Sequence, residues 1–273
     1  MAQALLLKTH DSPMEKMPGH WLLARMGKRV LRPGGRELTQ RLLASLAIDS
    51  TDDVVEFAPG LGETARETLA QQPLSYTGVE RDPEAARTVT QILSGPDQRC
   101  VLGTAEQTGL ADASASVVYG EAMLSMQLPA AKARIVAEAV RLLRPGGRYG
   151  IHELCLRPDD VPEKIREAIA NDLSDKIHVG VRPLSSIEWC QLLESAGLVA
   201  TSVETAPMHL LEPRRLLQDE GFFHAIRFIF NVVRHQAARR RVLTMRRVFR
   251  KHKQHLSAVA VVAVKPPNPA CEN

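Results

Sequence analysis

The sequence predicts an α/β protein in which helices cover a buried, mainly parallel sheet. Residues 54–69 pass from an apolar run through a glycine turn into a helical segment. Short β-branched runs then alternate with amphipathic segments as far as residue 154, and parallel strands require such helical crossovers. Of the 273 residues, 44% are hydrophobic, which is enough to build a sizeable core.

The first fifty residues are predicted to form a helical cap. Residues 1–19 show no clear period and contain two prolines, so we expect a mobile arm there. Helices are predicted over residues 20–30 and 37–46, on either side of an Arg-Pro-Gly-Gly breaker at 32–35.

The first predicted strand ends in a glycine loop. Val54, Val55 and Phe57 fit a strand buried on both faces, and Pro59 cannot donate to a continuing ladder. Gly60 and Gly62 let the backbone turn tightly and lie close to a ligand, and a helix begins at Glu63. This order predicts a cradle for a nucleotide-type cofactor.

Two cofactors fit this loop. The string from Gly60 to Ala65 satisfies the dinucleotide pattern G-x-G-x-x-G/A, which admits an NAD enzyme. However, Glu63 places a carboxylate where a pyrophosphate would lie, and like charges repel. Glu56, just before the loop, suits an ammonium group. A cationic sulfonium ligand that carries an amino acid therefore fits better.

The second strand is predicted over residues 75–80 and ends at Glu80, twenty residues after Gly60. A carboxylate here can accept hydrogen bonds from both hydroxyls of a ribose, which NAD and the sulfonium ligand share. Arg81 is a candidate to lie against the adenine face, and Asp82 is predicted to cap the next helix.

The remaining core elements follow the same alternation. The third strand lies near residues 99–102 and leads into the segment 103–110, and the fourth has its core at 117–119. A helix predicted over 129–143 ends at a Pro-Gly-Gly turn, which precedes a fifth strand at 148–154.

Three of these segments resemble motifs of the class I S-adenosylmethionine-dependent methyltransferases. Residues 56–62 resemble the first motif, 103–110 the G-D-A-E-x-L-P segment, and 142–148 the L-K-P-G-G turn. With Glu80 they occur in the family's order and approximate spacing, whereas an NAD enzyme explains only the loop and that acid. The chain departs from the family at Thr104 and Ser116, where Asp is usual.

The resemblance implies a Rossmann-like, seven-stranded, mostly parallel sheet with helices on both faces and an antiparallel last strand at 256–264. It also implies S-adenosylmethionine as the cofactor. The cofactor-binding residues that it implies are Glu56, Ala58, Gly60, Gly62, Glu80, Arg81, Thr104, Ala105, Glu106 and Glu121.

Candidates for catalysis and acceptor binding come from strand ends on the same edge. Glu121 and His152 are candidate catalytic residues, with His152 as a general base, although a hydrogen-bonded core histidine is the alternative for that position. N-terminal helices cover the cofactor site in the resembling family, which adds Trp21. The substrate-pocket candidates are Trp21, Met123, His152, Phe223 and Phe230.

About fifty residues are inserted between a sixth strand at 198–204 and the last strand. Residues 207–255 contain twelve Lys and Arg against three Asp and Glu, a net charge of +9 in a chain of +4. Apolar residues at 222, 223, 226, 230 and 233 fall at helical spacing and are expected to pack on the protein itself or to wall a hydrophobic pocket. The basic run at 239–253 fits a solvated helix face, or a surface that attracts phosphate backbones or anionic lipid headgroups.

Composition narrows the remaining possibilities. Cys100, Cys155, Cys190 and Cys271 are widely spaced, so neither a metal site nor a disulfide framework is predicted. The apolar run near the start of the sequence is too short for a signal peptide. No segment is long and apolar enough to span a membrane, so we expect a cytoplasmic protein without a transmembrane segment.

We expect a single methyltransferase domain over residues 1–265, with cap helices at 1–50, a cofactor-binding core at 51–206, the insertion at 207–255, a last strand at 256–265 and a flexible tail at 266–273. The predicted function is methyl transfer to a small, lipophilic or aromatic acceptor, because the closest likeness is to the ubiquinone and menaquinone biosynthesis type. The alternatives are a nucleic-acid methyltransferase that uses the basic insertion, and a non-catalytic module that binds the cofactor.

Overall fold

A computed structural model describes residues 13–267, so the predicted arm up to residue 12 and the predicted tail beyond residue 267 lie outside it. The helices are α2 (Gly19–Arg25), α3 (Gly35–Leu46), α4 (Glu63–Leu69), α5 (Pro83–Thr90), η1 (Leu124–Met126, 3-10), α6 (Pro129–Leu142), α7 (Glu163–Ile177), α8 (Ser186–Glu194), α9 (Pro213–Glu220), α10 (Phe222–Arg234) and α11 (Gln236–Lys251). The strands are β1 (Asp53–Phe57), β2 (Ser75–Glu80), β3 (Gln98–Leu102), β4 (Ala115–Glu121), β5 (Leu143–Leu156), β6 (Leu184–Ser185), β7 (Val199–Pro207) and β8 (Leu256–Val264).

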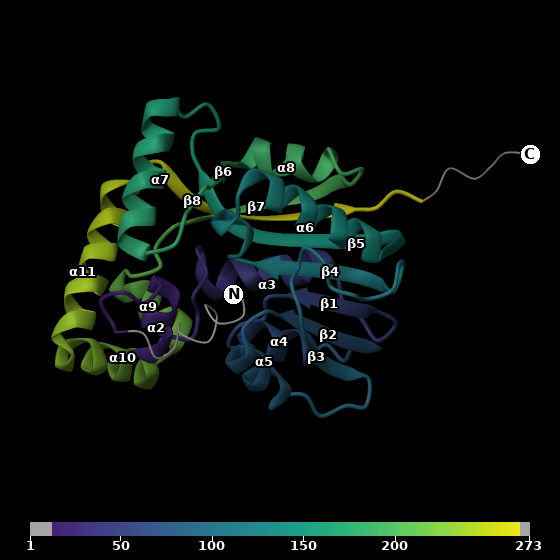
Figure 1. Cartoon of the computed structure of the whole chain (residues 1–273), viewed down its shortest axis with the longest axis horizontal. Coiled ribbons are helices and arrows are strands. Elements are labelled where there is room, and N and C mark those ends of the chain that lie inside the picture. Colours follow the sequence, from purple (N-terminus) through teal and green to yellow (C-terminus); the bar gives the residue numbers. More distant parts are fainter. Residues whose placement is uncertain (1–12, 268–273) are drawn as a thin grey trace, which may run out of the picture.

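The strands form one eight-stranded sheet in the order β3-β2-β1-β4-β5-β8-β7, with β6 paired to β5 outside this path (Figure 1). The pairs from β3 to β5 are parallel, whereas β8 runs antiparallel to β5 and to β7. The predicted fold class is therefore confirmed. The prediction of seven strands omitted β6, which has only two residues and no readable period.

Helices cover both faces of the sheet, and β8 shows why the two faces have separate cores. Its alternating side chains pack on one side with α3, through Leu38, Leu42 and Leu46. On the other side they pack with α6 and α8, around Ile135 and Trp189. Because both faces are covered, eight of the nine residues of β8 are buried, as its continuous apolar sequence requires.

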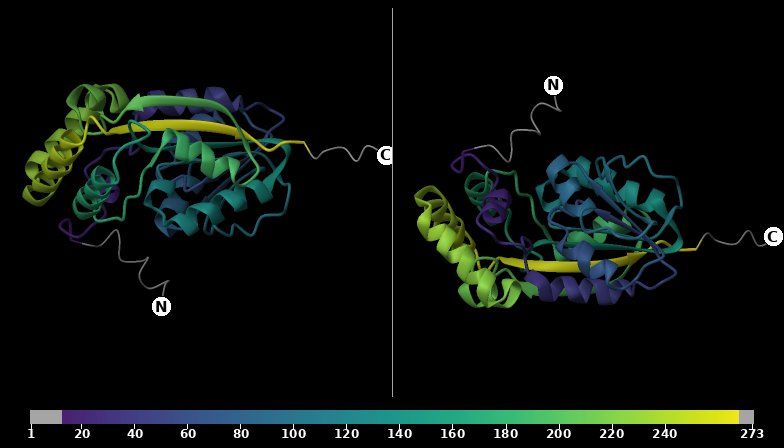
Figure 2. Two further views of the ribbon diagram at one scale, coloured as in Figure 1. Left: turned by 90° about the horizontal axis from the view of Figure 1, so that it is seen from above. Right: turned by 90° about the horizontal axis from the view of Figure 1, so that it is seen from below.

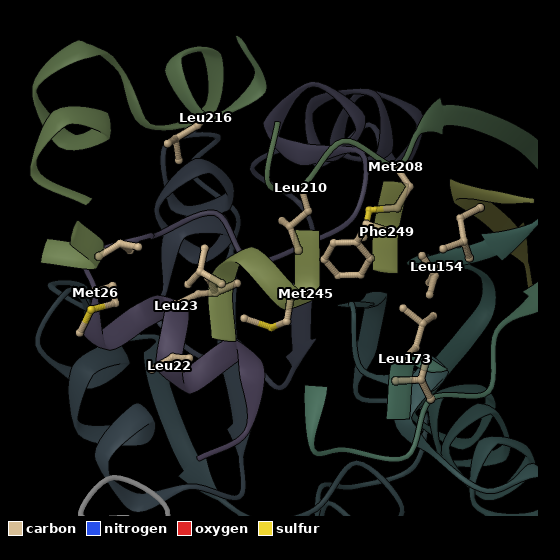
Figure 3. Close-up of a cluster of buried hydrophobic side chains, with 14 of the residues drawn as sticks. Leu22, Leu23, Met26, Leu154, Leu173, Met208, Leu210, Leu216, Met245 and Phe249 are labelled. Carbon is tan, nitrogen blue, oxygen red and sulfur yellow. The ribbon is translucent and has the colours of Figure 1, made fainter. Parts of the chain in front are cut away.

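Five helices, α2, α7, α9, α10 and α11, gather beyond the carboxyl ends of the parallel strands, and we call this group the helical lobe (Figures 1 and 2). It has its own apolar cluster, which includes Leu22, Leu173, Leu216 and Phe249 and reaches Leu154 at the end of β5 (Figure 3). The lobe thus brings the N-terminal cap, the segment after β5 and the insertion together at the end of the sheet.

One buried carboxylate ties the insertion to the N-terminal cap. Glu220, at the end of α9, accepts hydrogen bonds from the backbone N–H groups of Arg29 and Val30, each at 2.9 Å. Its Oε1 also lies 3.3 Å from Lys28 Nζ, and neither side chain of this ion pair is exposed. We call residues 26–33 the strap, because Glu220 holds this segment against the lobe.

The prediction that the insertion's apolar stripe packs on the protein itself is wrong. Phe222, Phe223, Ile226, Phe230 and Val233 are all exposed. The side of α10 that packs on the protein instead carries Ala225, Phe228 and Val232. A helical spacing identifies one apolar face, but α10 has apolar residues around most of its circumference, so spacing alone does not show which face is buried.

Candidate active site

A cavity of about 360 Å³ lies where the carboxyl ends of the strands meet the helical lobe. This volume is within the usual range of small-molecule sites. The cavity has a polar end at the glycine loop and the ends of β1, β2 and β4, and an apolar end beneath the lobe.

Glu56 lines the polar end and is buried. Its Oε2 accepts hydrogen bonds from the hydroxyls of Tyr76 at 2.6 Å and Tyr119 at 2.7 Å. Burial raises the pKa of the Glu56 carboxyl to about 7, and the two tyrosine hydroxyls oppose that rise only in part. The pocket therefore contains a carboxylate that a cationic ligand group would stabilise.

Glu80 organises the glycine loop from the end of β2. One carboxylate oxygen accepts from the Gly60 N–H at 3.0 Å, and the other from the N–H groups of Arg81 and Asp82. Burial raises the pKa of Glu80 in spite of these donors. Glu80, Gly60 and Arg81 all line the cavity.

Gly62 differs from the other residues of the loop because it does not line the cavity. Its φ is +74°, and a Cβ there would lie 2.8 Å from Ile92 Cδ1. The glycine is thus required for the packing of the loop against the segment after α5. Among the other implied cofactor residues, Ala58, Thr104, Ala105, Glu106 and Glu121 do line the cavity.

Glu121, at the end of β4, is held by four side chains. Its Oε1 accepts from Thr39 Oγ1 at 2.6 Å and contacts His152 Nδ1 at 2.7 Å. Its Oε2 accepts from the Thr64 hydroxyl and lies 3.4 Å from Arg32 Nη1. Burial alone would raise the pKa of Glu121, but the Arg32 guanidinium and the hydrogen bonds outweigh it and lower the pKa to about 2. Such a weak base with its oxygens occupied is poorly suited to removing a proton from an acceptor.

His152 is fully buried and does not line the cavity, contrary to its prediction as a pocket residue. Its two ring nitrogens face the Glu121 carboxylate and the Pro33 carbonyl oxygen. Both partners are hydrogen-bond acceptors within the fold, so neither ring nitrogen is turned towards a methyl acceptor in the cavity. The geometry is that of the hydrogen-bonded core histidine, which joins the end of β5 to the strap.

Arg32 is a pocket residue that the sequence analysis treated only as part of a helix breaker. Its side chain is 9% exposed and lines the cavity beside Glu121. Nε and Nη2 are buried and have no hydrogen-bond partner among the described residues. Since a buried donor without a partner is costly, these two groups mark a place for an anionic ligand group. No periodicity distinguishes this arginine from a surface residue.

Glu153 was also missed. It lies at the end of β5, is fully buried and lines the cavity. Its carboxylate accepts from the N–H groups of Met123, Leu124 and Ser125 and from the Ser125 hydroxyl. Burial raises the pKa of Glu153, which these donors oppose. Glu153 thus fixes the turn at η1 that presents Met123 to the cavity.

The apolar end is lined mainly by the helical lobe and the segments that join it to the sheet. Met208, Leu210, Met245 and Phe249 contribute from the insertion, and Leu154 from β5 (Figure 3). The predicted pocket residues Trp21 and Met123 line the cavity too.

Phe223 and Phe230, by contrast, do not line the cavity, because they lie on the outer face of α10 with exposures of 83% and 59%. The insertion does reach the cavity, but through α11 and residues 208–210 and not through the outer face of α10.

Residues 13–267 contain no metal cluster, no disulfide and no membrane-spanning helix. No group of three or more His, Cys, Asp or Glu there is arranged to hold a metal ion. Cys100, Cys155 and Cys190 are free thiols, and Cys271 lies outside the described residues. No described helix is long and apolar enough to cross a membrane.

Comparisons with known proteins agree with this architecture. The model of the methyltransferase domain family matches residues 55–151. An uncharacterised protein of Haemophilus influenzae is 30% identical over 247 residues, which cover 88% of this chain and 96% of that protein.

Solved structures resemble the fold at low identity. Haemonchus contortus phosphoethanolamine N-methyltransferase 2, in complex with S-adenosyl-L-methionine, has a TM-score of 0.68 at 14% identity, covering 91% of this chain and 57% of that one. Geranyl diphosphate methyltransferase, also in complex with the cofactor, has a TM-score of 0.61 at 16% identity, covering 83% and 84%.

The fold and the family model define a Rossmann-like methyltransferase. The chain belongs to the class I S-adenosylmethionine-dependent methyltransferases and uses S-adenosylmethionine as its cofactor.

Proposed function

We propose that this methyltransferase modifies a small lipophilic acceptor, which binds in the apolar end of the cavity while the cofactor occupies the polar end. The observation that carries the proposal is the division of one cavity into these two ends. Met208, Leu210, Met245 and Phe249 offer an acceptor no charged group. An apolar acceptor is favoured there because its hydrocarbon surface leaves water.

The polar end has the two charges that the amino-acid part of the cofactor needs. Glu56 would face the α-ammonium group, and the two unpartnered donors of Arg32 would face the α-carboxylate. Glu80 would hold the ribose and Arg81 would lie against the adenine, as the resemblance to the family implies. Each group of the cofactor then meets a side chain of complementary character.

Positioning and exclusion of water are the main contributions that we assign to the protein. The cofactor supplies an activated methyl group on its sulfonium, so the chain needs chiefly to align an acceptor nucleophile with it. The strap and the lobe cover the cavity from the side away from the sheet. We assign no general base, since Glu121 and His152 are both committed to hydrogen bonds within the fold.

Two ligands test the assignment at the polar end. We expect Arg32→Met to weaken S-adenosylhomocysteine binding about tenfold or more, because hydrogen bonds to charged groups contribute about 1.5–3 kcal/mol. Methylthioadenosine lacks the amino-acid group, so its affinity should change little. Calorimetric titration of both ligands measures the difference. Equal weakening of the two would contradict the placement of the α-carboxylate at Arg32.

Phenolic acceptors with alkyl chains of increasing length test the apolar end. With the cofactor concentration held constant, the KM for the acceptor should fall as the chain lengthens until the cavity is filled. Each methylene that becomes buried contributes about 0.8 kcal/mol to the binding free energy of the acceptor. Formation of S-adenosylhomocysteine is the readout. Turnover that is independent of chain length would overturn the lipophilic acceptor, and good cofactor binding without any turnover across the series would favour the non-catalytic alternative.

A further inference from the structure

Helix α10 has an apolar face that nothing in the described chain covers. Six large residues lie on this face (Figures 1 and 2 show the position of the helix). Their exposures are 64% for Phe222, 83% for Phe223, 47% for Ile226, 48% for Ile229, 59% for Phe230 and 55% for Val233. Scattered exposed apolar residues are normal, but a contiguous group of this kind marks an interaction surface.

The geometry of the helix makes these six residues one stripe. At 100° per residue they span an arc of about 120°, with Phe222 and Phe223 in edge-to-face contact at its N-terminal end. Arg227 and Arg234 lie along one border of the stripe, and both are exposed. The other border is the buried side of the helix.

The helix is firmly held in this orientation. Ala225, Phe228 and Val232 pack into the apolar cluster of the lobe. Asn231 Nδ2 also donates to the Met26 carbonyl oxygen at 2.9 Å, which fixes α10 against the strap. The exposed stripe is therefore the outer face of a packed helix, and not the inner face of one that has moved away.

The charge around the stripe selects its partner. Residues 221–255 contain ten Lys and Arg and no Asp or Glu, and Arg239, Arg240 and Arg247 of the neighbouring α11 are exposed. A second copy facing the first across a two-fold axis would bring these like charges together. An anionic lipid surface instead complements both features, because its acyl region accepts the apolar stripe and its headgroups accept the arginines.

We propose that α10 docks in the interface of an anionic lipid bilayer, with the six apolar residues below the headgroups and Arg227 and Arg234 at the level of the phosphates. A helix of 13 residues is about 20 Å long, which suits a helix lying in the plane of the membrane. This surface lies apart from the cavity, so the docking does not depend on the identity of the methyl acceptor.

Flotation of the full-length protein with vesicles tests the proposal. We expect binding to phosphatidylcholine vesicles that contain about one third phosphatidylglycerol, and much weaker binding to pure phosphatidylcholine. The double change Phe223→Ser with Phe230→Ser should lower the partition coefficient at least about a hundredfold, since two large apolar side chains would no longer enter the bilayer. The charge change Arg227→Gln with Arg234→Gln should reduce the preference for the anionic vesicles.

A matched control separates docking from general loss of surface apolarity. Ile187 of α8 is 53% exposed outside the lobe, and Ile187→Ser should leave vesicle binding unchanged. All these changes affect exposed side chains, and retained binding of S-adenosylhomocysteine confirms that each variant is folded.

Any of four results would contradict the proposal. The first is no binding of the wild type to anionic vesicles, and the second is binding that the phenylalanine changes leave intact. The third is a stable dimer in sedimentation velocity that the phenylalanine changes dissociate, which would make the stripe an interface between two copies. Tight, salt-sensitive binding of a 40-nucleotide RNA that depends on the arginines but not on the phenylalanines, without vesicle binding, would also count against it.

Discussion

The two ends of the cavity are built in different ways. The polar end is built mainly on the sheet, where Glu56, Glu80 and Glu121 lie at or next to the carboxyl ends of the neighbouring parallel strands β1, β2 and β4. The strap adds Arg32 to this end. The apolar end combines residues from β5, α7 and the insertion, which only the tertiary fold brings together. Under the proposed assignment, the cofactor binds at the strand ends and the acceptor at segments that can vary independently of the sheet.

Within the polar end, the pKa values of two largely buried carboxyls shift in opposite directions. Glu56 has only neutral hydroxyl donors, so burial dominates and its pKa is about 7. Glu121 has the charged Arg32 close by, so its pKa is about 2. This contrast supports the proposed pairing of Glu56 with the ammonium group of the cofactor, whereas Glu121 already has a charged partner in Arg32.

The largest expected effect concerns Glu121, through the free energy of unfolding. Glu121→Gln should lower that free energy by about 3–5 kcal/mol, because it leaves the buried Arg32 without its counter-charge. The depressed pKa of Glu121 means that this stabilisation is complete above about pH 4.5 and is lost as pH falls towards 2. Denaturant unfolding measures this: the difference in unfolding free energy between the wild type and the variant should be smaller at pH 4 than at pH 7.

Glu163 provides the control for this measurement. It pairs with Arg166 at 3.4 Å, but its side chain is 72% exposed. Glu163→Gln should change stability by less than about 1 kcal/mol, as is usual for surface pairs. If Glu121→Gln lowered the free energy of unfolding by no more than Glu163→Gln, the buried pair would be no more important for stability than the surface pair.

An intermediate effect is expected at Glu56, on cofactor affinity. Its raised pKa implies that wild-type affinity for S-adenosylhomocysteine rises between pH 5.5 and pH 7, as the carboxyl ionises and can pair with the ammonium group. Glu56→Gln should weaken binding about tenfold at pH 7 and flatten this pH dependence. Calorimetric titrations at several pH values give both quantities, and a variant that keeps the wild-type slope would exclude Glu56 as its source.

In the protein without cofactor, ionisation of Glu56 should have an unfavourable effect: the stability of the fold decreases as pH rises. A carboxyl whose pKa is raised by folding costs stability as pH rises from about 4.5 through 7, because the unfolded chain ionises first. The melting temperature of Glu56→Gln should fall less over this range than that of the wild type. Affinity that rises with pH, together with cofactor-free stability that falls with pH, distinguishes a cation-binding carboxylate from a carboxyl that is only destabilised by burial.

The smallest effect is expected at the apolar end. Met245 lines the cavity, and Met245→Gln keeps the length of the side chain while making it polar. The KM for a long-chain phenolic acceptor should rise about fivefold to tenfold, with cofactor affinity unchanged. Leu243 lies on the same helix but is 43% exposed and outside the cavity, so Leu243→Gln is the matched control. Equal effects of the two changes would argue against acceptor binding at this end.

The same division describes what the sequence could predict. The order of the core elements was predictable because local signals mark them: β2 at residues 75–80 and β8 at 256–264 agree with their predicted bounds. Most of the implied cofactor residues line the cavity, since strand ends of a parallel sheet share one edge. Gly62 does not line the cavity; a glycine is needed there because a side chain would collide with Ile92.

The parts of the cavity that the strap and the insertion supply were less predictable, for a physical reason. Arg32 and Phe249 reach the cavity through contacts between segments that are remote in sequence, and no local period records such contacts. His152 was assigned by its place at a strand end, but side chains there alternate, and its own points into the fold. For α10, a strong helical pattern was identified correctly, and the direction of its exposed face was not.

The buried bond between Glu220 and the strap has a consequence for exchanging parts between related enzymes. Residues 28–30 satisfy that carboxylate, and without them a transplanted insertion would bring an uncompensated charge into its new host. Residues 26–33 and 207–255 therefore form one transferable module, although nearly the whole cofactor domain separates them along the chain. A chimera that is meant to acquire the acceptor preference of this protein has to take both pieces.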